Sequence, residues 1–175
     1  MDQGTGSALV HALKYEGWSR VAQPMAVQMA RLNFPPDVIA ERTALVAVPL
    51  SATRQRERGY NQAALLANAL GDLWHMPVWS DAVQRIRSTT SQVRLTPSDR
   101  AANVAEAFAS SSFVAKRLAG AHLMLVDDVI TTAATLNAAA QVLINRGARI
   151  VSYVTFGRAP DPGDRAVPEL DLDQE

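Results

Sequence analysis

Three short apolar runs, separated by residues with helical spacing, constrain the fold of this chain more than any other feature. The runs lie at 44–48, 122–127 and 149–156. Apolar runs without polar alternation suit strands that are covered on both faces. Strands that alternate with helices pair in parallel through right-handed crossovers. The sequence therefore predicts an α/β fold, with an open, mainly parallel, twisted sheet and helices on both faces.

The residues between these runs divide into helices and connections. A short strand is expected at 77–80, a polar loop at 49–60, and either a hairpin or a mobile loop at 83–97. Two side chains, Asn61 and Ser98, are expected to cap helices. Helices are expected at 7–15, 18–33, 61–73, 98–108 and 134–146.

The last residues differ in composition from the rest. From Pro160 onward the sequence holds three prolines and six acidic residues against one basic residue, Arg165. Such a segment has too few apolar side chains to offset the entropy of ordering it. We expect 160–175 to be a disordered acidic tail and 1–159 to form one domain.

Composition excludes several classes of protein. Lys plus Arg and Asp plus Glu both number 17, so no global basic field attracts nucleic acid, although local arginines still permit a DNA contact. The absence of cysteine excludes disulfides and thiolate zinc sites in this chain. No apolar run approaches the roughly 20 residues of a membrane span, and the first residues do not resemble a signal peptide. We expect a cytoplasmic protein with no membrane contact.

The stretch LMLVDDVITTAATLNAA, at 123–139, carries the most chemical information. An apolar strand meets two acids, Asp127 and Asp128, and a loop of small residues at 131–135 then opens a helix. The first turn of a helix offers unpaired N–H groups to a phosphate, and small residues allow close approach. The acids repel a phosphate but suit the vicinal hydroxyls of a ribose, or Mg²⁺ held through water. The stretch predicts a site for a ribose 5-phosphate.

The location of the loops in the expected sheet supports this interpretation. Loops 49–60 and 127–135 both leave the carboxyl ends of strands, where ligands bind in such sheets, so they should face one crevice. Simpler explanations remain open for both features. Paired acids also occur in solvated turns, and the arginine-containing loop at 49–60 could be an ordinary solvent-exposed loop. A phosphorylatable receiver domain also uses adjacent acids, but its acids would follow the first strand.

The same stretch resembles the phosphoribosyl diphosphate signature of type I phosphoribosyltransferases, in which a strand runs into two acids, then Thr-Thr-Gly-X-Thr, then a helix. Three further blocks resemble the ComF family of phosphoribosyltransferase-like proteins, which are associated with bacterial DNA uptake. The resemblance covers about 8–158, with the segments in the family's order. The blocks are HALKYEGW at 11–18, VPLSATRQRERGYNQAALLA at 48–67 and RIRSTTSQVRLTPSDRAANVAEAF at 85–108.

The resemblance implies a helical hood at 1–36, an α/β core at 44–158, and a reaction in which a nitrogen nucleophile displaces pyrophosphate from phosphoribosyl diphosphate with Mg²⁺. It implies that Asp127 and Asp128 hold the ribose hydroxyls and contact Mg²⁺ through water. Further expected roles are as follows: Thr131, Thr132, Ala133, Ala134 and Thr135 hold the 5-phosphate; Leu50, Ser51 and Arg54 meet the pyrophosphate; Arg85 and Arg87 close over it; Tyr15 and Trp18 face the acceptor.

Two departures from the family pattern leave a second hypothesis open. Longer members carry a cysteine-rich, zinc-binding N-terminal segment, and this chain has no cysteine. Ala133 replaces the loop glycine, which costs roughly 1 kcal/mol if the position needs a positive φ. The alternative to a transferase is a non-catalytic member: a ligand sensor or an accessory of DNA uptake that acts beside a helicase or another uptake protein. The acceptor is not predicted.

Overall fold

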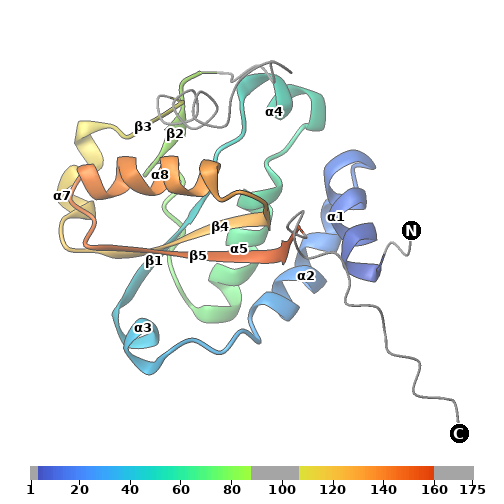
Figure 1. Ribbon diagram of the computed structural model, residues 1–175, viewed down its shortest axis with the longest axis horizontal. Coiled ribbons are helices and arrows are strands. Elements are labelled where there is room, and N and C mark those ends of the chain that lie inside the picture. Colours follow the sequence, from blue (N-terminus) through green and yellow to red (C-terminus); the bar gives the residue numbers. More distant parts are fainter. Residues whose placement is uncertain (1–3, 88–106, 160–175) are drawn as a thin grey trace, which may run out of the picture.

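A parallel sheet with β4 at its centre organises the fold (Figure 1). In this computed structural model, which describes residues 4–87 and 107–159, the strand order is β1-β4-β5. Strand β1 is Arg42–Ala47, β4 is His122–Ile130 and β5 is Ile150–Arg158. Both pairings of β4 are parallel, so the predicted α/β class and the parallel sheet are confirmed.

Helices cover both faces of this sheet. Figure 1 shows α8 along one face and α2 and α5 along the other. A second, two-stranded antiparallel sheet joins β2, Gln84–Arg85, to β3, Phe108–Ala109. None of the helices in the described ranges is long and apolar enough to cross a membrane. The α-helices are α1 Thr5–Tyr15, α2 Ala22–Met29, α3 Pro36–Glu41, α4 Ala52–Arg58, α5 Gln62–Trp74, α7 Ala115–Leu118 and α8 Ala134–Asn145, and 3₁₀ turns span Ser19–Val21 and Ser112–Val114.

Strand β4 contributes to two separate apolar clusters. Leu123 and Leu125 belong to the cluster that includes side chains of α8, whereas Met124 and Val126 belong to the cluster that includes side chains of α2 and α5. Successive side chains of a strand point to opposite faces. Both faces are therefore dry, which explains why the apolar run shows no alternation in the sequence.

The predicted cap of α5 is confirmed. The Asn61 side chain accepts a hydrogen bond from the Ala63 N–H at 3.0 Å and donates one to the Val48 carbonyl at 3.0 Å. The first bond satisfies a backbone N–H in the first turn that has no partner within the helix. The second bond fixes the start of α5 to the end of β1. Asn61 thus sets the length and direction of the connection between these two elements.

The polar segment 49–60 is not a loop throughout, and this prediction was wrong. Residues 52–58 form α4, which begins where the Ser51 Oγ accepts from the Arg54 N–H at 3.3 Å. It ends at Gly59, whose φ of 78° is left-handed. No residue of α4 is buried, so the helix has no apolar stripe and leaves no periodic signal in the sequence.

The other predicted elements differ mainly at their ends. The helix expected at 18–33 begins as a 3₁₀ turn and ends at Met29, and α3, which starts at a proline suited to the first helical position, was not predicted. The strand expected at 77–80 is a single bridge between Val78 and Leu45. The helix expected at 98–108 falls mostly outside the described residues, and Phe108 itself lies in β3. Within 83–97, β2 is described and 88–97 lie outside the description.

Gly71 provides a test of how closely α5 packs against Met76 and Val78. A Cβ added there would lie 2.9 Å from the Met76 carbonyl oxygen and 3.0 Å from Val78 Cγ2. We expect Gly71→Ala to lower the free energy of unfolding by about 1–2 kcal/mol in chemical denaturation, because the clash outweighs the gain in helix propensity. The matched control is Gly6→Ala in α1, whose Cβ would make an ordinary 3.7 Å contact with Phe156. Equal stability of the two variants would contradict the packing described.

Candidate functional site

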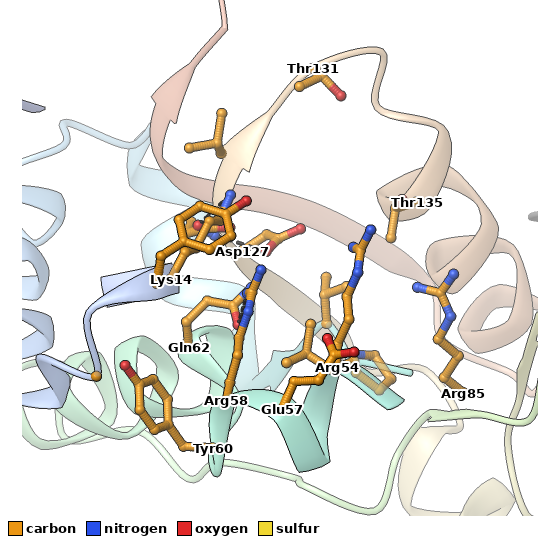
Figure 2. A pocket seen from close by; sticks show the side chains of 17 residues that line it. Lys14, Arg54, Glu57, Arg58, Tyr60, Gln62, Arg85, Asp127, Thr131 and Thr135 are labelled. Atoms are coloured by element: carbon orange, nitrogen blue, oxygen red, sulfur yellow. Dashed lines mark hydrogen bonds and ion pairs between the residues drawn. The ribbon is translucent and has the colours of Figure 1, made fainter. Parts of the chain in front are cut away.

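A pocket of about 600 Å³ opens at the carboxyl ends of β1 and β4 (Figure 2). Both segments expected to face one crevice contribute to it, as do α1 and β2. Several of its side chains are charged. The charged residues of the lining are Lys14, Arg54, Glu57, Arg58, Arg85, Asp127 and Asp128.

The pocket exists because β1 stops before β4 does. The Val48 N–H still donates to the Val126 carbonyl at 3.0 Å, but Pro49 has no N–H to continue the ladder. Strand β4 runs on to Ile130, paired with β5 alone. The prediction that the strand ends at the acids was therefore wrong: Asp127 and Asp128 belong to the strand, at the step that β1 leaves open.

The Asp128 side chain is buried beside α1, which belongs to the segment expected to form the hood. The residue is 2% exposed and points to the same face as Met124 and Val126, which is the face that Leu13 of α1 also covers. Lys14 Nζ lies 2.7 Å from Asp128 Oδ2. Within the described residues that oxygen has no hydrogen bond of regular geometry, so the Lys14 ammonium is the contact that compensates its charge there. Lys14 was not predicted as a site residue, although it belongs to the HALKYEGW block.

Two further contacts hold the end of α1 over the pocket. The Tyr60 hydroxyl donates to the Leu13 carbonyl at 2.6 Å, and the Arg58 guanidinium lies 5.3 Å from the centre of the Tyr15 ring. Tyr60 follows α4 in the chain, so the hood is fastened to the segment that leaves β1. Lys14 lies between these two contacts in the sequence, which fixes its position above Asp128.

Asp127 is a weaker acid than usual. Burial raises its pKa to about 7, and the negative charge of Asp128 acts in the same direction. The Asp128 N–H donates to Asp127 Oδ1 at 2.9 Å, and together with the charge of Lys14 this opposes the rise only in part. Asp127 therefore keeps its proton to a higher pH than a solvent-exposed aspartate does.

The loop between β4 and α8 contains a left-handed residue directly before the helix. Ala133, at the N-cap of α8, has φ 58° and ψ 1°, so the alanine occupies the left-handed region. Thr131 and Thr135 line the pocket, whereas the structure does not place Thr132, Ala133 or Ala134 in its lining. In the part of the chain that the structure describes, no side chain caps α8, so its first N–H groups have no capping side-chain acceptor there.

The opposite wall is basic. Leu50, Arg54 and Arg85, three of the residues expected to meet the pyrophosphate, line the pocket. Burial lowers the pKa of Arg85 from its ordinary value, and the positive charge of Arg54 adds to the effect, so the two guanidinium groups act on each other. Arg87 is exposed and does not line the pocket; its carbonyl accepts from Arg85 Nε at 3.2 Å.

Two other predicted residues do not join the lining. The Ser51 side chain caps α4 instead of pointing into the pocket, and Trp18 is 60% exposed outside it, whereas Tyr15 does line it. Several other residues line the pocket, all of them within the quoted blocks; the stretch RQRERGY at 54–60 was considered as an anion site, but none of these residues was given an individual role. These residues are Lys14, Glu57, Arg58, Tyr60 and Gln62.

Comparison with known proteins identifies the class. The family model described as "Phosphoribosyl transferase domain" matches residues 76–171. The chain is 35% identical over 152 residues to "DNA utilization protein YhgH" of Escherichia coli K12, covering 83% of this chain and 63% of that protein. It is 37% identical over 120 residues to "Competence protein F" of Haemophilus influenzae, covering 66% of this chain and 50% of that protein. The class is thus phosphoribosyltransferase-like.

Within that class, the chain belongs to the ComF family. A further relative, "Competence protein ComFC" of Bacillus subtilis, is 34% identical over 119 residues, with 66% of this chain and 44% of that protein covered. This chain therefore spans 44% to 63% of the length of these relatives. Among solved structures, a Trypanosoma cruzi hypoxanthine phosphoribosyl transferase is similar at a TM-score of 0.46 and 16% identity, over 83% of this chain and 75% of that one.

The left-handed alanine leads to a prediction about stability. We expect Ala133→Gly to raise the free energy of unfolding by about 0.5–1 kcal/mol, because glycine adopts a positive φ without a Cβ clash. The neighbouring Ala134→Gly is the control: Ala134 is the first helical residue, so the same change should lower the free energy of unfolding by up to about 1 kcal/mol. Chemical denaturation measures both. A loss of stability in both variants would show that the loop does not hold its left-handed turn.

The raised pKa of Asp127 leads to a prediction about pH. Its folded-state pKa of about 7 lies above the ordinary value of 3.8, so the folded protein binds this proton more tightly than the unfolded chain does. The resulting stabilisation is complete below about pH 4 and is lost as the pH rises through about 7. We expect the melting temperature without metal to fall more steeply from about pH 4 to about pH 8 in the native protein than in Asp127→Asn. Identical slopes would place the titration elsewhere.

Proposed function

We propose that this protein binds phosphoribosyl diphosphate with Mg²⁺ in the pocket and transfers the phosphoribosyl group to a nitrogen nucleophile. The observation that carries the proposal is the convergence of three kinds of group on one pocket. These are two carboxylates of β4 beyond the end of β1, the loop that opens α8, and the arginines Arg54 and Arg85. A sugar bearing a phosphate at one end and a pyrophosphate at the other needs this combination.

Each group has a role that its chemistry suits. Asp127 and Asp128 would accept hydrogen bonds from the ribose hydroxyls. The first N–H groups of α8, with the Thr131 and Thr135 hydroxyls beside them, would hold the 5-phosphate. Arg54 and Arg85 would bind the pyrophosphate, because guanidinium groups match phosphate oxygens in pairs.

The same residues suit Mg²⁺ in one particular way. Carboxylate oxygens are ligands that Mg²⁺ prefers, but Lys14 already lies against Asp128 Oδ2. Within residues 4–87 and 107–159, no three His, Cys, Asp or Glu side chains gather in a group that could hold a metal ion. The acids therefore suit a hydrated ion that is bound mainly by the pyrophosphate itself. Mg²⁺ would neutralise charge on the leaving group.

The proposed reaction exchanges one bond at C1 of the ribose. The C1–O bond to pyrophosphate breaks and its electron pair leaves with the pyrophosphate, while the lone pair of the nitrogen forms the new C1–N bond. The proton carried by the nitrogen is released. Positive charge builds on the ribose ring in the transition state, and the acids beneath the ring favour it. The protein's contribution is positioning and electrostatics.

A second candidate is ligand binding without transfer, as a sensor or accessory in DNA uptake. Ala133 favours it, because the Cβ stands where the signature has glycine and the loop pays a conformational cost to keep its shape. Relatives named for competence and DNA utilisation favour it too. Both candidates share the sugar-phosphate site and differ only in whether a bond is exchanged.

Thermal denaturation with ligand tests the shared site. We expect millimolar phosphoribosyl diphosphate with Mg²⁺ to raise the melting temperature, because a ligand at a hundred times its dissociation constant stabilises by about 2.7 kcal/mol. For a domain of this size that is roughly 5–10 °C. Asp127→Asn and Asp128→Asn should each remove most of the shift, while Asp72→Asn, an exposed acid of α5 outside the pocket, should keep it.

The outcomes separate the candidates. Absence of any shift, in the native protein and in Ala133→Gly alike, would exclude both. A shift accompanied by pyrophosphate release on addition of an acceptor base establishes the transferase. A shift without release across a broad panel of nitrogen bases supports the sensor.

A further inference from the structure

The cations of the pocket form two groups at different ends of it. Arg54 and Arg85 lie on the side of Thr135, whereas Lys14 and Arg58 lie nearer the hood (Figure 2). The charge of Arg54 acts on Arg85, as expected of two cations that face a common space. This first pair lies where the proposed pyrophosphate would sit. The second pair lies where α1 covers the pocket.

The two cations at the hood end are in different electrostatic states. Lys14 is compensated by Asp128. Among residues 4–87 and 107–159, the partners of Arg58 are neutral groups: its Nη1 donates to Gln62 Oε1 at 2.9 Å, and its guanidinium lies 5.3 Å from the centre of the Tyr15 ring. In the described part of the chain, no carboxylate forms an ion pair with Arg58.

The remaining acid of the lining does not alter this contrast. Glu57 is three residues after Arg54 on α4, a spacing at which side chains are neighbours on a helix surface. Glu57 and Arg58 are consecutive, and consecutive helical residues do not face each other. Asp127 and Asp128 are assigned to the ribose in the proposed function. Arg58 is thus the cation at the hood end that lacks a counter-charge in the described structure.

The contacts of Arg58 also fix its orientation. Gln62 is 4% exposed, so the amide that receives Nη1 is itself immobilised, and Tyr15 covers one side of the guanidinium. A guanidinium held by neutral partners keeps its full charge and its planar fork of donors. Such a fork binds a carboxylate through two parallel hydrogen bonds, which gives direction as well as strength.

We propose that Arg58, braced by Gln62 and Tyr15, selects an acceptor that carries a carboxylate: a planar nitrogen nucleophile with an acid group on its ring. This inference rests on the proposed function, because it names the acceptor class of the same pocket. The carboxylate serves only for recognition by Arg58 and is unchanged by the reaction. The nitrogen lone pair forms the bond to C1 as pyrophosphate leaves.

Calorimetry with matched probes tests the inference. The protein is first saturated with Mg²⁺ and ribose 5-phosphate, which has no pyrophosphate to displace, so no transfer occurs. Anthranilate is then compared with aniline, and orotate with uracil. We expect each acid to bind at least about tenfold more tightly than its neutral partner, the factor that corresponds to 1.4 kcal/mol. Arg58→Gln should remove this preference, and Arg58→Lys should recover only part of it.

Arg56→Gln is the matched control, because Arg56 is an exposed arginine of the same helix and does not line the pocket. It should retain the preference of the native protein. Equal binding of acids and neutral partners by the native protein, or an unchanged preference in folded Arg58→Gln, overturns the inference. So does loss of ribose 5-phosphate binding in that variant, which would assign Arg58 to the sugar. Failure of ribose 5-phosphate to stabilise even the native protein overturns the proposed function and this inference together.

Discussion

The parallel pairing of β4 with two strands of unequal length determines the site. Pairing with β1 brings the segment around α4 to the same edge as the loop before α8, and pairing with β5 carries the two acids past the end of β1. The exposed step between the strands is where the pocket opens. A longer β1 would continue the hydrogen-bond ladder alongside the acids and fill that step.

The hood depends on the core for its position, and the core depends on the hood to compensate a buried charge. Leu13 is fully buried in the cluster formed by α2, α5 and the sheet, so the hydrophobic effect holds α1 in place. The Tyr60 hydroxyl then sets the direction of its last turn. Without the Lys14 ammonium, the Asp128 carboxylate would remain uncompensated in a nearly dry environment, which is costly. Stability and the arrangement of the site are therefore coupled in this region.

The sequence predicted those features that follow from local patterns, and missed those that depend on distant residues. Continuous apolar runs identified the strands, and the change from strand to acids to small residues identified the loop at 131–135, including the consequence of a positive φ at Ala133. The helix α4 was missed because it buries no side chain. The end of β4 was misplaced because charges usually end a buried strand, whereas here Lys14 from a distant helix compensates one of them.

The ion pair between Lys14 and Asp128 has a consequence for whatever enters the pocket. A ligand that binds the Asp128 carboxylate must displace Lys14. The free energy that it gains is therefore the difference between its own contact with Asp128 and the contact that Lys14 makes. A ligand can displace Lys14 if it places its hydroxyls in the right geometry and binds the protein through other groups as well. Water and simple alcohols have no such additional binding groups, so they do not displace Lys14.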